Sequence, residues 1–320
     1  MKHLNGVGIA FCGGGFRSFA EVAAVEDMER AKVHIAAAAG TSMGSLVATL
    51  VAAGLPAKQI AELLVEMDQR IVEKGILRGM KFRVISLANS NGLIENSVVE
   101  EQARHTLHEA GIETFSDLVM PLAIPAVDIL TGDLCVFTNS PELFADTSGG
   151  WTLVPGNHNL AKVITASASY PLAIQPTHYM NRLLMDGGCR LNLPTPLFDR
   201  ESLDAVVGIG MIRDFKPLKD VNPLSIVQRT LSYGARSLDY FSASAADLYI
   251  NLPVSGEDAF QAGTGKEVIK EARDFIHQNP IAWDSVKPDP LASLRKTAAD
   301  SIARLFRGTS MTNTTHKLII

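Results

Sequence analysis

Short apolar runs alternate with amphipathic stretches along the first fifty residues. Residues 7–11 and 33–39 are almost wholly apolar and have the length of buried strands. Residues 19–31 carry apolar side chains at helical spacing, and small and apolar residues over 45–53 predict a second helix. Strands that alternate with helices in this way predict an α/β fold with a largely parallel, buried sheet.

The same pattern continues along the rest of the chain. Further helices are predicted over 56–74, 97–110, 160–168 and 266–277, and further strands over 122–128, 134–138, 182–185, 205–209 and 248–252. Residues 75–92 are punctuated by glycine, serine and asparagine, and we interpret them as a surface excursion that could form a lid. We expect one domain over residues 1–280 and a tail over 281–320.

The composition limits the classes of function. The chain has 320 residues, of which 47% are hydrophobic and 20% charged, values typical of a globular protein with a sizeable core. Its formal net charge of −5 argues against a nucleic-acid partner. No apolar run is long enough to span a bilayer, and no separate signal region precedes the first strand. Three widely spaced cysteines suggest a reducing compartment, so we expect a cytoplasmic location.

A G-x-S-x-G sequence follows the second predicted strand. Residues 40–44 are Gly-Thr-Ser-Met-Gly, with an expected strand before them and an expected helix after them. In a nucleophile elbow the serine occupies a sharp turn that exposes its hydroxyl at the sheet edge, and the flanking glycines let strand and helix approach closely. Ser42 is therefore a candidate nucleophile, and an ordinary glycine–serine turn is the alternative.

Serine chemistry also needs N–H donors for an oxyanion. Gly13, Gly14 and Gly15 end the first predicted strand, which we expect to lie beside the elbow strand. A run of glycines leaves its N–H groups unshielded, and the N–H of Met43 would add a donor. Arg17 could steady this loop or bind a substrate phosphate, and a structural salt bridge is its other interpretation.

The base is harder to place. None of the eight histidines lies in a glycine-rich setting at a strand end. Asp186, by contrast, follows a short predicted strand and precedes Gly187 and Gly188. An acid at a strand end can reach an elbow on a nearby strand of the same sheet, which allows a serine–carboxylate pair. An Asp-Gly-Gly turn without a catalytic role is the alternative.

Taken in order, these motifs resemble those of the patatin-like phospholipases, a family of lipid acyl hydrolases with a Ser–Asp dyad. The glycine loop with its basic residue, the elbow and the Asp-Gly-Gly motif all match. Residues 91–94, 121–128, 166–171 and 192–194 resemble further family landmarks, and the whole resemblance covers residues 7–276. The family's glycine motif usually closes with glycine, where this chain has Ser18, a departure that could shift the loop.

The resemblance implies a three-layer α/β/α sandwich around a mainly parallel central sheet. It also implies a lipid acyl hydrolase of the phospholipase A type, in which Asp186 takes the proton of Ser42 as the hydroxyl attacks an ester. The amides of residues 13–15 would hold the oxyanion, and water would cleave the acyl-enzyme. The expected substrate is a phospholipid or another acyl-ester lipid, and no metal or cofactor is expected.

Two other functions stay open from the sequence. The order Ser…Asp…His could end in His277, which would give an α/β-hydrolase esterase with a triad. A catalytically silent lipid- or nucleotide-binding domain is the second alternative. Against it, residues 263–266 (Gly-Thr-Gly-Lys) lack the first glycine and the final Ser/Thr of a P-loop.

Peripheral membrane contact follows from the expected substrate. The tail contains an apolar stripe at helical spacing, made of Leu291, Leu294, Ala298, Ile302, Leu305 and Phe306. Lys296, Arg304 and Arg307 flank this stripe. A basic amphipathic helix of this kind could lie in a lipid interface or dock on the protein's own core.

Overall fold

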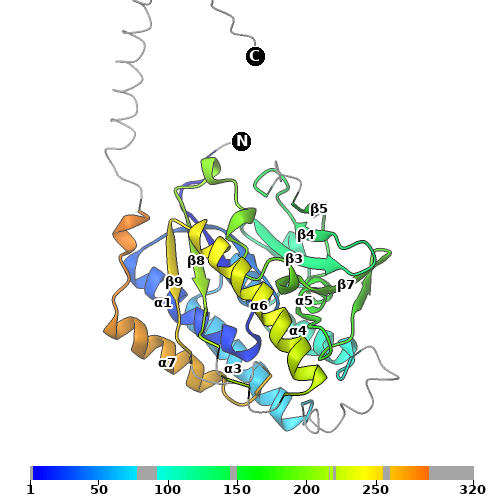
Figure 1. The fold of residues 1–320 in the computed structure, drawn as a ribbon. Coiled ribbons are helices and arrows are strands. Elements are labelled where there is room, and N and C mark those ends of the chain that lie inside the picture. The colour runs from blue at the N-terminus through cyan, green and yellow to red at the C-terminus, as the bar shows by residue number, and fades with distance from the viewer. Residues whose placement is uncertain are drawn as a thin grey trace, which may run out of the picture. The chain divides into compact units, whose positions relative to one another are not determined.

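The structure is a computed structural model that describes residues 3–77, 92–144, 150–215, 217–218, 221–254 and 260–287. These residues form a nine-stranded sheet with flanking helices (Figure 1). The strands are β1 (Val7–Phe11), β2 (Ile35–Gly40), β3 (Leu122–Asp128), β4 (Leu134–Thr138), β5 (Thr152–Pro155), β6 (Thr177–Tyr179), β7 (Arg182–Asp186), β8 (Ala205–Gly210) and β9 (Leu248–Asn251).

The sheet is mixed but mostly parallel, which confirms the predicted fold class. Its main strand order is β5-β4-β3-β2-β1-β8-β9, and β7 and β6 branch from β3. Along the main order every pair is parallel except β3–β4, whereas the pairs β3–β7 and β6–β7 are antiparallel.

Helices flank the sheet close to their predicted positions. The α-helices are α1 (Val22–Ala31), α2 (Met43–Ala52), α3 (Ala57–Glu73), α4 (Asn96–Glu109), α5 (Leu160–Ala168), α6 (Pro223–Ser244) and α7 (Gly265–Gln278). The segment predicted as one helix over 19–31 is divided, because the 3₁₀ helix η1 (Gly15–Glu21) leads into α1. Helix α6 and the strands β5 and β6 have no counterpart among the elements predicted from the sequence.

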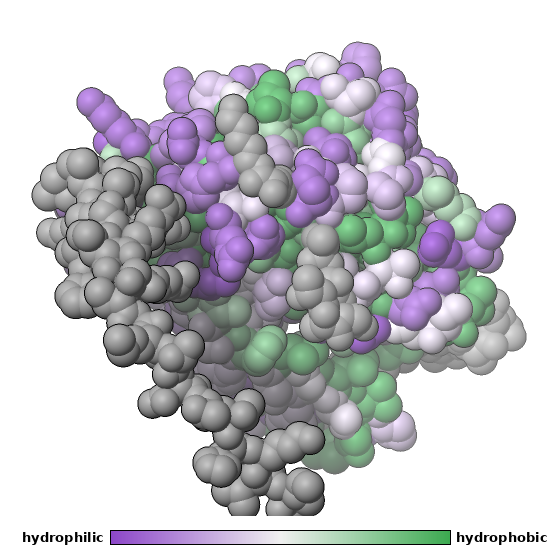
Figure 2. Space-filling model, turned by 90° about the horizontal axis from the view of Figure 1, so that it is seen from above, coloured by the Kyte–Doolittle hydropathy of each residue, from purple (hydrophilic) through white to green (hydrophobic). Residues whose placement is uncertain are grey.

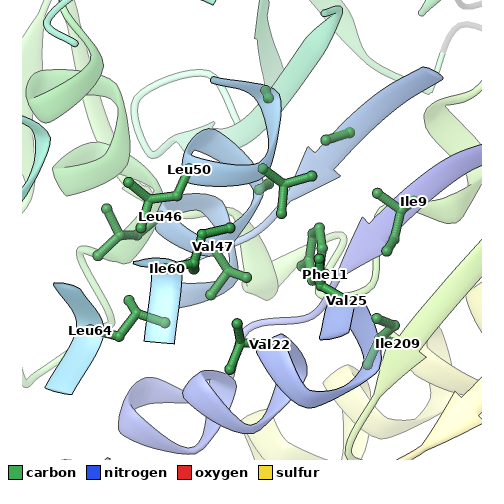
Figure 3. Packing of buried hydrophobic residues seen from close by; sticks show 14 of the residues in the cluster. Ile9, Phe11, Val22, Val25, Leu46, Val47, Leu50, Ile60, Leu64 and Ile209 are labelled. Carbon is green, nitrogen blue, oxygen red and sulfur yellow. The ribbon is translucent and has the colours of Figure 1, made fainter. Parts of the chain in front are cut away.

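Alternate residues of each strand enter two hydrophobic layers. Ile9 and Phe11 of β1 pack with side chains of α1, α2 and α3 on one face (Figure 3). Ala10, between them, belongs to the layer on the other face, which includes Leu193 and against which Ala243 of α6 packs. Because both faces are covered, the strands appear in the sequence as continuous apolar runs.

The strand register brings distant segments to one edge of the sheet. β1 lies parallel to β2 and Phe11 pairs with Gly40, so the glycine loop follows directly beside the elbow, as predicted. β2 pairs with the first two residues of β3 and then ends. Beyond that point β7 lies beside β3, with Asp186 opposite Ala126. The ends of β1, β2 and β7 therefore meet.

By its internal contacts the chain divides into two units, residues 1–286 and 287–320. The predicted stripe over 291–306 and most of the excursion predicted over 75–92 lie outside the described residues, and the domain boundary at residue 280 stays a prediction. In the described part of the chain, no helix combines the length and the apolar character needed to cross a bilayer.

Candidate active site

Ser42 occupies the turn between β2 and α2. Its backbone angles are φ +54° and ψ −129°, a strained combination for a residue with a side chain. A Cβ on Gly40 would lie 2.3 Å from the carbonyl oxygen of Gly44, and one on Gly44 would lie 2.4 Å from the carbonyl oxygen of Cys12. Close backbone approach therefore requires both glycines, as a nucleophile elbow needs.

Hydrogen bonds fix this turn. The Ser42 N–H donates to Oγ of Ser167 on α5 (2.9 Å), whose hydroxyl donates in turn to the carbonyl oxygen of Pro125 on β3 (2.7 Å). The hydroxyl of Thr41 donates to the carbonyl oxygen of Leu191, beyond β7 (2.9 Å). The half-buried Ser42 side chain is thus held in a defined position relative to β3 and the end of β7.

Asp186 ends β7, and only 3% of the residue is exposed. Its carboxyl accepts a hydrogen bond from the Gly188 N–H (2.7 Å), and the hydroxyl of Ser42 lies close enough to interact with it. Burial raises the pKa of Asp186 from 3.8 to about 6, and its interactions with the Gly188 N–H and the Ser42 hydroxyl oppose that rise. A Cβ on Gly187 would lie 2.3 Å from the Pro125 carbonyl oxygen, so glycine is needed there too. The structure therefore brings the two predicted side chains together.

The glycine loop lies directly against the elbow, since a Cβ on Gly13 would be 2.9 Å from the Cβ of Ser42. The N–H groups of residues 14–15 and of Met43 have no hydrogen-bond acceptor among the described residues. The Gly13 N–H differs, because it donates to the carbonyl oxygen of Asn192 (3.2 Å). Of the four expected oxyanion donors, three are available, and Gly13 is engaged within the fold.

Two polar side chains hold the glycine loop. Nε of Arg17 donates to the carbonyl oxygen of Gly14 (3.1 Å). Because a trans peptide points its carbonyl and the following N–H in opposite directions, this bond orients the Gly15 N–H away from Arg17. Ser18 is fully buried and donates from its hydroxyl to the carbonyl oxygen of Cys12 (3.1 Å). These contacts favour the loop-supporting role of Arg17, and Ser18 closes the loop with a hydrogen bond.

A buried carboxyl group that the sequence analysis misses packs against the same loop. Oε1 of Glu21, in η1, accepts the N–H of Cys12 (2.7 Å), while Oε2 has no partner among the described residues. Burial raises the pKa of Glu21 well above its usual value, which favours the protonated form. The only signal in the sequence is one acidic residue inside an apolar stretch.

A second unpredicted carboxyl group comes from α6. The amide of Asn192 donates to both carboxyl oxygens of Asp239, each at 3.2 Å. Burial raises the pKa of Asp239 to about 6, and the Asn192 hydrogen bond opposes the rise. A Cβ on Gly13 would lie 2.5 Å from Oδ1 of Asn192, and a Cβ on Gly188 would lie 2.9 Å from the same atom. Asn192 therefore fills the space between the glycine loop and the aspartate loop, and Asp239 connects α6 to it.

No histidine in the described part of the chain hydrogen bonds to Ser42 or Asp186. His158 is buried, but its ring contacts the carbonyl oxygen of Val154 (3.0 Å) and the hydroxyl of Tyr179 (3.3 Å). His277, the candidate for a triad, is exposed in the last turn of α7.

The family model for patatin-like phospholipases matches residues 9–199. The match covers more than half of the chain and includes the glycine loop, the elbow and the aspartate motif. The chain therefore belongs to the patatin-like phospholipase family, whose members are lipid acyl hydrolases.

Individual proteins are more distant. The chain is 27% identical over 217 residues to the uncharacterized protein YqhO of Bacillus subtilis (strain 168), covering 65% of this chain and 71% of that protein. It is 25% identical over 209 residues to the uncharacterized protein R571 of Acanthamoeba polyphaga mimivirus, covering 63% of this chain and 64% of that protein. The crystal structure of VipD from Legionella pneumophila is similar with a TM-score of 0.42 and 13% sequence identity, and the match covers 87% of this chain and 66% of that chain. The chain thus spans about two thirds of the length of these relatives.

Proposed function

We propose that this protein is a lipid acyl hydrolase of the phospholipase A type, with Ser42 as nucleophile and Asp186 as base. The observation that carries the proposal is the proximity of the Ser42 hydroxyl to the buried Asp186 carboxyl, whose pKa it lowers, next to a glycine loop with N–H groups that have no acceptor among the described residues. Membership of the patatin-like family supports an acyl-ester lipid as the substrate.

In the acylation step, the Asp186 carboxylate takes the proton of Ser42 as Oγ attacks the ester carbonyl carbon. A pKa of about 6 makes this carboxylate a better base than an ordinary aspartate while leaving it mostly ionised at pH 7. The oxyanion accepts hydrogen bonds from the N–H groups of Gly14, Gly15 and Met43, and the N-terminus of α2 adds a favourable dipole. The leaving alcohol takes the proton from Asp186.

In the deacylation step, water attacks the acyl ester on Ser42. Asp186 takes a proton from the water and returns it to Oγ of Ser42 as the acyl bond breaks, which releases the fatty acid. One carboxyl group acts as base and acid in turn, so neither step requires a histidine or a metal ion.

The nucleotide-binding alternative is weakened by contacts at the start of α7. The N–H groups of Gly263 and Gly265 donate to the two carboxyl oxygens of Asp68, at 2.6 and 2.7 Å. A phosphate would need these same amides, which a carboxyl group of the protein already occupies. The exposed position of His277 gives no support to the triad either.

Product analysis by mass spectrometry tests the proposal. Wild-type protein is incubated with phospholipids, glycerides and acyl-thioesters, with Ser42→Ala as the control. We expect a fatty acid and a lysophospholipid from the wild type and neither from the variant. Hydrolysis that persists unchanged in Ser42→Ala would contradict the assignment of the nucleophile, and release from glycerides alone would replace the phospholipase with a neutral-lipid lipase.

A further inference from the structure

Helix α6 has its polar and apolar sides reversed relative to an ordinary surface helix. Its less exposed stripe consists of small or polar residues: Ser225, Arg229, Ser232, Ala235, Arg236, Asp239, Ser242 and Ala243. Its exposed side consists largely of apolar and aromatic residues: Ile226, Val227, Leu231, Tyr233, Leu238, Tyr240 and Phe241. A helix that faces water on its outer side normally shows the opposite arrangement.

The exposure of this face is substantial. Phe241 is 65% exposed, Tyr240 54% and Ile226 50%. Val221, just before the helix, is 74% exposed. Figure 2 views the molecule from above, and hydrophobic side chains appear among hydrophilic ones along its lower edge, which corresponds to the side of the molecule that α6 crosses in Figure 1. A contiguous group of exposed apolar residues of this kind marks an interaction surface.

The opposite stripe of α6 fixes the helix next to the proposed active site. Asp239 holds the amide of Asn192, which lies between the glycine loop and the aspartate loop. Ser242 is buried, and its carbonyl oxygen accepts the hydroxyl of Thr195 at 2.5 Å. The apolar face therefore lies on the outer side of a helix whose inner side contacts the residues around the nucleophile.

The charges on α6 fit an anionic surface. The helix contains three charged residues, and its single acidic residue, Asp239, is turned inward. The other two are Arg229 and Arg236, which lie at the edge of the apolar face with their guanidinium groups 5.1 and 4.7 Å from the ring centre of Phe215. Nη2 of Arg236 also lies 2.9 Å from Oδ1 of the exposed Asp214. The two arginines and Asp214 together leave one net positive charge beside the apolar face, although the chain as a whole has a formal net charge of −5.

We propose that the outer face of α6 docks on the surface of an anionic phospholipid bilayer and places the Ser42 site against its substrate. Apolar and aromatic side chains would enter the interface, with the flanking arginines near the phosphates. This inference rests on the proposed function for its choice of a bilayer over another partner. It also assigns membrane contact to a helix of the described domain rather than to the predicted tail stripe.

Vesicle co-sedimentation measures this docking without hydrolysis if every protein carries Ser42→Ala. The vesicles contain equimolar phosphatidylcholine and phosphatidylglycerol. Val227→Glu puts a charge on the proposed face, where Val227 is 48% exposed, and Val119→Glu makes the same change at a valine that is 72% exposed in the turn before β3. We expect Val227→Glu to weaken binding by about tenfold or more and Val119→Glu to change it by less than about twofold.

Activity assays separate this inference from the proposed function. In the active protein, Val227→Glu should slow hydrolysis of vesicle lipids but not of a short-chain soluble ester. If the wild type hydrolyses neither substrate while vesicle binding still depends on Val227, the proposed function fails and the docking surface stands. Equal vesicle binding by Val227→Glu and Val119→Glu overturns the docking surface.

Two other occupants of the face give different results. Light scattering that shows Val227→Glu converting a dimer to a monomer, with vesicle binding unchanged, would assign the face to contact between two copies of this chain. If vesicle binding is lost on deletion of residues 288–320 but is unaffected by Val227→Glu, membrane docking would be assigned to the tail instead of α6. Either result overturns the proposal.

Discussion

Replacement of Asp186 by asparagine tests whether this carboxyl group is kept for its chemistry at the expense of stability. Burial raises its pKa from 3.8 to about 6. Because the folded state binds the proton more tightly than the unfolded state, the stability that the carboxyl group contributes is complete below pH 3.8 and is lost as the pH rises through about 6. The rise in pKa corresponds to about 3 kcal/mol, so at pH 8 the ionised group is less favourable in the fold by that amount.

Asp186→Asn keeps the shape of the side chain and removes the charge. We expect its free energy of unfolding to exceed that of the wild type by about 2 to 3 kcal/mol at pH 8 and to match it near pH 4, while ester hydrolysis is lost. Urea unfolding at the two pH values, followed by tryptophan fluorescence, measures the difference. Ser42→Ala is the matched control, because it removes the reacting hydroxyl, leaves the buried charge in place and should show no such gain.

Two outcomes would refute this reasoning. If Asp186→Asn is less stable than the wild type at pH 8, the carboxylate is a structural anchor and the cost of its burial has been misjudged. If the variant is more stable by the same amount at pH 4 and pH 8, the gain does not come from the removed charge.

The remaining predictions concern the identity of the base and the packing of the elbow. The rate of hydrolysis of a short-chain soluble ester should rise with pH to a plateau, with a midpoint near 6 as Asp186 ionises. Asp239 also has a pKa of about 6, so Asp239→Asn is the control and should keep that midpoint. A midpoint that disappears in Asp239→Asn would reassign the base to Asp239. Gly44→Ala should destabilise the fold by about 1 to 3 kcal/mol, because its Cβ would lie 2.4 Å from the Cys12 carbonyl oxygen. At Gly234 of α6 an added Cβ would meet no atom within 4 Å, so Gly234→Ala should instead stabilise the fold by about 0.5 to 1 kcal/mol. Thermal melts in which the melting temperatures of both variants shift in the same direction would contradict the packing argument.

Much of the fold could be predicted because its sheet is buried on both faces. The runs over 7–11 and 33–39 are apolar for that reason, and they identify β1 and β2 directly. The candidate dyad could also be predicted, because Ser42 and Asp186 lie in short motifs whose glycines are required by close backbone contacts and whose order resembles that of the patatin-like family; the resemblance implied the pairing. Local sequence therefore carries the information for these positions.

Helix α6 is not among the predicted elements although its sequence carries start signals, an Asn222 N-cap followed by Pro223. What the sequence could not show is which side of this helix faces the protein. In α6 serine, alanine and aspartate face the protein, and the apolar side chains face outward. Helical periodicity also does not indicate which side of a helix is covered.

The polar contacts around the loops are long-range and escape sequence analysis for a different reason. Asn192 and Asp239 meet only because α6 returns to the aspartate loop. The hydrogen bond from the Gly13 N–H to the Asn192 carbonyl oxygen depends on the same tertiary arrangement, so the sequence does not show that this expected donor already has an acceptor. The burial of Glu21 likewise follows from tertiary packing, which brings its carboxyl group to the N–H of Cys12 just after β1.

The proposed mechanism can be tested most directly by labelling with a fluorophosphonate and locating the modified peptide by mass spectrometry. If Ser42 is the nucleophile and Asp186 its base, the wild-type protein is labelled at Ser42, Asp186→Asn is labelled far more slowly, and Ser42→Ala is not labelled. A label on a different serine, or lipid hydrolysis by a protein that the probe never modifies, would contradict it.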